Sequence, residues 1–216
     1  KSYLNELPTI ERIVKERARL LIEHDIWGSI TFESLDRWLS NFQGEEEQLL
    51  SILMLDQLVI RSSDQTAGLL AHAIETVLPN VNSNSVWEAL EESDYVEMLT
   101  SKTGENKGIK IIPVIRDSDS PAKSGPAVAR LYRRYVNIND SFMIWPWNLD
   151  KQYNKGVRIF VFIDDTVGSG KQFCKFFTKT VDKTYPDARF IYIPLLAHQD
   201  GLEYIRNLHP EIRVGA

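Results

Sequence analysis

The chain has 216 residues, 43% of them hydrophobic and 25% charged, which is typical of a folded globular protein. Its net charge of −5 and isoelectric point near 5.5 exclude the general basic field of a nucleic-acid-binding protein. A single cysteine, Cys174, excludes an intrachain disulfide framework, and we expect a cytoplasmic protein. No run of ~18 apolar residues predicts a membrane-spanning helix, and no signal-peptide pattern opens the sequence.

The first half of the chain predicts one helix after another. Apolar residues recur at nearly helical spacing, and polar or acidic residues stand at the expected helix starts, Thr31 among them. Asp64 is the predicted N-cap of a fourth helix, and Pro79 its predicted end. We therefore expect an all-helical N-terminal region over residues 1–105. Its predicted helices cover residues 7–27, 31–42, 44–63, 63–81 and 82–100.

The pattern changes at a polar, glycine-containing stretch, residues 100–108, where we place a domain boundary near residue 105. Short, almost continuously apolar runs follow, and such runs predict strands that are covered on both faces. Helical patterns separate them, so residues 106–216 predict an α/β domain with a doubly wound parallel sheet. The runs cover residues 109–115, 158–164 and 189–196, and the final "EIRVGA" predicts a further strand, beyond which we expect residues to be missing.

Two adjacent acids, Asp164 and Asp165, follow the apolar run "RIFVFI". On a regular strand they would point to opposite faces, and one carboxylate would lie unpaired under a helix at a high cost in free energy. We therefore predict that the strand ends near Asp164 and that both acids reach its carboxyl end, where ligands bind in open α/β sheets. There they can accept hydrogen bonds from two neighbouring hydroxyls, each worth about 1.5–3 kcal/mol.

The next residues have the composition of an anion site. Gly168 and Gly170 permit a left-handed backbone whose N–H groups converge, and the following helix directs its positive end to the same point. Vicinal hydroxyls beside a phosphate describe a ribose 5-phosphate. The alternatives are an ordinary turn with incidental acids and a P-loop nucleotidase. The P-loop motif fits poorly, because Asp165 stands where it needs glycine and Gln172 where it needs Ser or Thr.

The sequence "IFVFIDDTVGSGKQF" resembles the signature of the type I phosphoribosyltransferases, which is a hydrophobic strand, two acids and a short loop before a helix. That family binds phosphoribosyl pyrophosphate (PRPP) with Mg²⁺ carried on the ligand. The resemblance implies that Asp164 and Asp165 hold the ribose. It implies a 5-phosphate loop made of Thr166, Val167, Gly168, Ser169, Gly170, Lys171 and Gln172. The four histidines show no metal-ligand spacing, so we predict no metal site formed by the chain itself.

A second loop, residues 116–126, follows the first predicted strand, where the family binds pyrophosphate. Residues suited to that task are two cations, a hydroxyl and a flexible glycine before a helix: Arg116, Lys123, Ser124 and Gly125. The two cations are the candidate catalytic residues, because they would stabilise the leaving pyrophosphate. Asp117 and Asp119 fit beside an anion only if Mg²⁺ bridges them. A polar surface loop is the alternative.

The resemblance implies a glycosyltransferase that binds Mg·PRPP and transfers or cleaves off the phosphoribosyl group. The alternative is a catalytically degenerate module that senses a phosphoribosyl or nucleotide ligand and docks a protein or nucleoprotein partner through the helical region. The family usually has Thr at the position of Gly168 or Ser169 and again at the position of Gln172. The absence of these hydroxyls favours the alternative. Helices ahead of such a core are similar to phosphoribosyltransferase-like proteins of bacterial conflict and retron loci, which implies antiphage defence.

Two further features have competing interpretations. Trp145 and Trp147 are predicted to be core residues, with a loop that covers the ligand as the alternative. Arg130, Arg133 and Arg134 lie on one predicted helix, where a solvated or ion-paired face competes with nucleic-acid contact. The acidic net charge counts against nucleic-acid contact.

Overall fold

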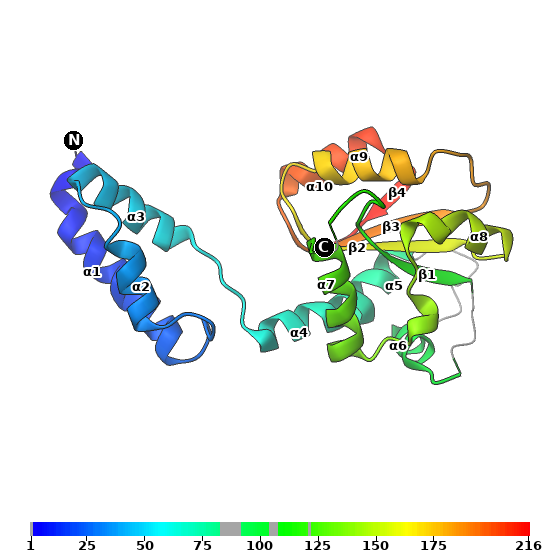
Figure 1. Cartoon of the computed structure of the whole chain (residues 1–216), viewed down its shortest axis with the longest axis horizontal. Helices are drawn as coiled ribbons and strands as arrows, with labels where there is room; N and C mark the ends of the chain where they lie inside the picture. The colour runs from blue at the N-terminus through cyan, green and yellow to red at the C-terminus, as the bar shows by residue number, and fades with distance from the viewer. Residues whose placement is uncertain (1, 83–91, 104–107, 121) are drawn as a thin grey trace. The chain divides into compact units, whose positions relative to one another are not determined.

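The structure, a computed structural model, describes residues 2–82, 92–103, 108–120 and 122–216 (Figure 1). It divides into two compact units, Lys1–Thr66 and Ala67–Ala216. The predicted boundary near residue 105 marks the change from helices to strands, and as a domain boundary it stays a prediction. None of the helices that the structure describes combines the length and the apolar composition that a bilayer crossing requires.

The first unit is a small helical assembly with its own core. Thr31 and Ser34 exchange two hydrogen bonds that cap the second helix, because each side-chain oxygen accepts the backbone N–H of the other residue. Its core gathers Val14, Ala18, Trp27, Leu35, Ile52 and Leu55. The three helices are α1 (Ser2–Glu23), α2 (Phe32–Leu39) and α3 (Glu45–Gln57).

Helices that pack onto the sheet of the second unit come next, and the first of them spans the boundary between the two units. Asp64 lies inside the first of them, and Ser62 and Gln65 exchange the capping hydrogen bonds instead. Pro79 does not end the helical stretch, because the π-helical turn before it runs directly into α5, of which Pro79 is the second residue. The predicted helix over residues 82–100 lies partly outside the described residues. These elements are α4 (Ser63–His72), the π-helical turn η1 (Ala73–Val77), α5 (Leu78–Asn82) and α6 (Glu92–Thr100).

The sheet has four parallel strands in the order β1-β2-β3-β4, which confirms the predicted α/β class. Helices cover both of its faces, as the continuous apolar runs predict. The strands are β1 (Ile109–Pro113), β2 (Ile159–Val167), β3 (Arg189–Ala197) and β4 (Ile212–Val214). The helices between them are α7 (Ser124–Leu131), α8 (Leu149–Asn154), α9 (Lys171–Thr180) and α10 (Gln199–Leu208).

Alternate residues of β1, β2 and β3 enter two separate apolar cores. On one face, Val161 and Ile163 pack with Tyr132, which follows α7 directly, and with the helices before β1. On the other face, Phe160 and Phe162 pack with the phenylalanines of α9. The helices that follow β1 and β2 therefore lie on opposite faces of the sheet, α7 on one and α9 on the other. Open α/β sheets bind ligands beside such a point, at the carboxyl ends of the strands.

Candidate functional site

Strand β2 continues to Val167, past the two acids, so the prediction that it ends near Asp164 is wrong. Asp164 pairs in register with Pro194 of β3, and its side chain is buried, with 6% of the residue exposed. The carboxylate accepts the Asp165 N–H at 3.0 Å and the Tyr192 hydroxyl at 3.3 Å. These two hydrogen bonds lower the cost of burial that the sequence argument treats as prohibitive.

The surroundings of the buried Asp164 carboxyl group oppose its ionisation. Burial and the neighbouring Asp165 carboxylate together raise the pKa of Asp164 to about 7, against the hydrogen bonds from the Asp165 N–H and the Tyr192 hydroxyl. Burial and the Asp164 carboxylate raise the pKa of the Tyr192 hydroxyl. Asp164 therefore carries a proton for part of the time at neutral pH. A carboxyl group so perturbed at the end of a parallel strand is a candidate ligand-binding group.

Asp165 occupies a different environment from its neighbour. It is partly exposed, and its Oδ1 accepts the Thr166 N–H at 2.8 Å. Alternation along the strand directs it to the face opposite Asp164. The two acids are thus adjacent in the sequence but unequal in burial.

The loop that follows contains one left-handed residue instead of the two that the glycines permit. Gly170 has φ 74° and is the N-cap of α9, whereas Gly168 does not adopt a positive φ. Because Gly170 has no side chain to cap the helix, the first N–H groups of α9 are available to an anion. The predicted helix start near Gly170 is confirmed.

The start of α10 packs closely against this loop, a contact that sequence reasoning missed. A Cβ atom on Gly201 would lie 2.0 Å from the Gly168 carbonyl oxygen, and one on Gly170 would lie 2.6 Å from the Gly201 oxygen. In addition, the His198 N–H donates to the Val167 carbonyl at 2.9 Å. The backbone of the loop is therefore held from one side by α10. The only signal in the sequence is a glycine within the first turn of a predicted helix.

A small cavity of about 140 Å³ opens between the loop and strand β3. The structure thus brings Asp164 together with most of the predicted 5-phosphate loop, whereas Asp165 and Lys171 do not line this cavity. Tyr192 is an additional lining residue that the sequence argument did not consider. The lining residues are Asp164, Thr166, Val167, Gly168, Ser169, Gly170, Gln172, Phe173 and Tyr192.

In the loop after β1, Asp119 binds both predicted cations. It accepts hydrogen bonds from the Arg116 guanidinium at 2.7 and 3.0 Å, and its Oδ1 lies 3.2 Å from Lys123 Nζ. The Arg116 backbone N–H donates to the same carboxylate at 3.0 Å. The Arg116 guanidinium holds the pKa of Asp119 well below its usual range. These ion pairs place Asp119 between the two cations, and the Mg²⁺ ion expected to bridge the acids stays a prediction.

The glycine of this loop has a packing role. Gly125 is buried in the first turn of α7, and a Cβ atom there would lie 2.6 Å from the Val114 carbonyl oxygen. It permits close packing of α7 on the end of β1, whereas the sequence argument expected flexibility. Ser124 is the first residue of α7, beside Lys123 at the N-cap. The loops after β1 and β2 follow adjacent parallel strands, so both lie at the same edge of the sheet.

Two aromatic residues between α7 and β2 are exposed, so the prediction that they belong to the core is wrong. Trp145 is 42% and Trp147 54% exposed, and their rings stack with centroids 5.2 Å apart. On the preceding helical turn, Arg133 pairs with Asp140 at 2.6 Å, in line with the ion-paired interpretation of the arginines.

Fold and site together define a phosphoribosyltransferase-like α/β protein, in which a buried parallel strand carries two acids near its carboxyl end and leads into a glycine loop. The PRTase-CE family model matches residues 35–216, which is more than half of the chain, and the chain belongs to this family. The predicted likeness to phosphoribosyltransferases is thereby confirmed. No curated protein and no solved structure matches the chain.

Proposed function

We propose that the protein binds PRPP together with Mg²⁺ and transfers or cleaves off its phosphoribosyl group. The observation that carries this proposal is the buried carboxyl of Asp164, with a pKa of about 7, at the cavity of the glycine loop. Such a group destabilises the fold at pH values where it is ionised, so a structural role alone does not account for it. Hydroxyl groups of a bound ribose would supply the hydrogen bonds that favour the ionised form.

The roles of the loop after β2 follow from its geometry. Asp164, which lines the cavity, would accept hydrogen bonds from the ribose hydroxyls, whereas a ribose contact by Asp165 rests on the family resemblance alone. The backbone from Thr166 to Gln172 would hold the 5-phosphate, with the free N-terminal amides of α9 beside it. The left-handed Gly170 supports this assignment, because it turns the chain into the helix without a side chain over the amides.

The loop after β1 would hold the pyrophosphate. Arg116 and Lys123 share the single carboxylate Asp119, so these three groups keep a net charge of +1. Mg²⁺ binds to enzymes mainly through substrate phosphates and one or two carboxylates, so the ion would be carried by PRPP. Within the described residues, acidic, histidine and cysteine side chains nowhere gather in threes as a metal site formed by the protein would need.

A second candidate function is a sensor that binds the phosphoribosyl ligand without turnover. The observation that favours it is the pairing of both candidate catalytic cations with Asp119, because a pyrophosphate group would have to compete with this carboxylate. In that case the N-terminal helices would dock a protein or nucleoprotein partner. A role in antiphage defence is compatible with either function and is part of the proposal.

Calorimetry with Mg·PRPP tests the proposal directly. We expect the wild type to bind and Asp164→Asn to lose most of its affinity. Asp36→Asn, which removes the same charge from exposed α2, should bind like the wild type. Absence of wild-type binding, or equal affinity in all three proteins, would refute the proposal. Pyrophosphate release over many turnovers would favour the transferase, whereas binding without release would favour the sensor.

A further inference from the structure

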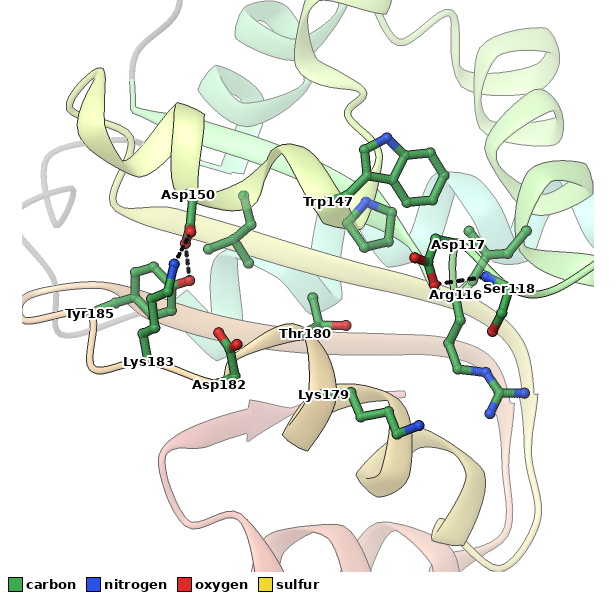
Figure 2. A pocket seen from close by; sticks show the side chains of 13 residues that line it. Arg116, Asp117, Ser118, Trp147, Asp150, Lys179, Thr180, Asp182, Lys183 and Tyr185 are labelled. Atoms are coloured by element: carbon green, nitrogen blue, oxygen red, sulfur yellow. Dashed lines mark hydrogen bonds and ion pairs between the residues drawn. The ribbon is translucent and has the colours of Figure 1, made fainter.

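A larger cavity, of about 280 Å³, lies on the face of the sheet that α9 covers. Three segments form it: the loop after β1, the turn that leads into α8, and the end of α9 with the residues that follow (Figure 2). It shares no lining residue with the small cavity at the glycine loop. None of the functions proposed above uses it, apart from the shared residue Arg116 in the loop after β1.

The cavity has an apolar floor and an aromatic wall. Ile115 and Leu149 are 5% and 1% exposed and form the floor. The indole of Trp147 stands at the rim with half of its surface open to solvent, and Figure 2 shows Thr180 of α9 on the opposite side. A large exposed indole at the rim of a cavity provides a stacking surface for a planar group. Trp145 stacks on Trp147 from outside the lining.

The charges around the cavity cancel. Three cations and three acids line it, which gives a formal charge of zero: Arg116, Lys179 and Lys183 against Asp117, Asp150 and Asp182. At one end, Asp150 is already bound by Lys183 and by the Tyr185 hydroxyl. The rim thus offers hydrogen-bond donors and acceptors without a net field that would favour an anion or a cation.

The volume sets the size of the occupant. Small-molecule sites usually measure about 300–1,000 Å³, so this cavity lies at the lower limit. It suits a single fused ring system, with or without a sugar that projects into solvent, and is too small for a dinucleotide. From these four properties we infer that the cavity binds a neutral, planar heterocycle of nucleobase size, stacked on Trp147. The inference does not depend on PRPP binding, because the two cavities have separate linings.

The test is calorimetry on the full chain without PRPP, with adenosine, guanosine, cytidine and uridine as probes. Benzoate and benzamidine serve as charged planar probes of similar ring size. We expect at least one nucleoside to bind more tightly than either charged compound. Trp147→Ala should weaken that binding by about tenfold or more, because stacking dominates the contact, and Trp147→Phe should restore part of it.

Trp145→Ala is the matched control, because it removes a similar exposed indole that does not line the cavity. We expect its affinity to stay within about threefold of the wild type, a much smaller change than the stacking loss expected at Trp147. Since both tryptophans are exposed, thermal melts should show that both variants fold. The inference is overturned if no nucleoside binds, if a charged probe binds more tightly, or if the two alanine variants weaken binding equally.

Discussion

The loops after β1 and β2 lie at the same edge of the sheet, yet their charged groups are in opposite states. In the loop after β1, Asp119 is held ionised by Arg116 and Lys123, and its charge is satisfied within the protein. In β2, Asp164 is buried beside a second carboxylate, Asp165, and its pKa is raised to about 7. The first loop is electrostatically stable by itself, whereas the second gains from a ligand that donates hydrogen bonds.

This difference suggests a division of roles between the two loops. A carboxyl group that is unfavourable to ionise in the free protein can be coupled to binding, because a ligand that stabilises its ionised form displaces a proton. A cation that is already paired with a carboxylate must be shared between that carboxylate and any anion that binds. It therefore stabilises the charge of a leaving group less than an unpaired cation would.

Gly201→Ala should have the largest effect, because its Cβ would overlap the Gly168 carbonyl oxygen at 2.0 Å. We expect a loss of about 3 kcal/mol or more in the free energy of unfolding, measured by urea denaturation, together with loss of PRPP binding. Gly68→Ala in α4 is the control: nothing lies within 4 Å of its Cβ, and it should gain about 0.5–1 kcal/mol. Similar stability in both variants would show that α10 does not hold the loop.

Asp164→Asn should change how stability depends on pH. The folded-state pKa of about 7 exceeds the ordinary value near 3.9, so the folded state binds the extra proton between these values and its stability falls as pH rises. The loss in the wild type amounts to at most about 4 kcal/mol by pH 8. We expect the variant to lack this loss and to be more stable than the wild type at pH 8, in urea titrations at pH 5 and pH 8. Parallel pH profiles for the two proteins would contradict the account.

Asp119→Asn should release Arg116 and Lys123 and raise the net charge of the group from +1 to +2. We expect Mg·pyrophosphate to bind about tenfold more tightly by calorimetry, because the anion no longer competes with a carboxylate. Asp117→Asn, at an exposed neighbouring acid, is the matched control and should have a smaller effect. Weaker pyrophosphate binding in Asp119→Asn would show that the carboxylate positions the cations instead of competing for them.

Much of the fold could be predicted from local patterns. Continuous apolar runs such as that around Phe160 and Phe162 require cover on both faces, and the two cores supply it. The start of α9 at Gly170 follows from a glycine before a helical pattern. Both features depend on residues that are neighbours in the sequence, so they can be predicted from the sequence alone.

The details of the site depend on residues that are distant in the sequence. The burial of Asp164 is tolerated because Tyr192 of the next strand donates to it, and the fixed loop depends on Gly201 in α10. Neither contact leaves a local pattern. Trp145 and Trp147 are exposed although large aromatic side chains usually lie in the core. Their rings stack on each other at the surface. Such features follow from the packing of whole elements.

The most direct test of the central claim is the pH dependence of Mg·PRPP binding in the wild type and in Asp164→Asn. If the ligand requires ionised Asp164, with its pKa of about 7, the wild-type affinity should fall about tenfold between pH 8 and pH 6 beyond any change in the variant. Calorimetry in buffers of different ionisation enthalpy should then show proton release that the variant lacks. Equal affinities and equal proton release in the two proteins would contradict the account.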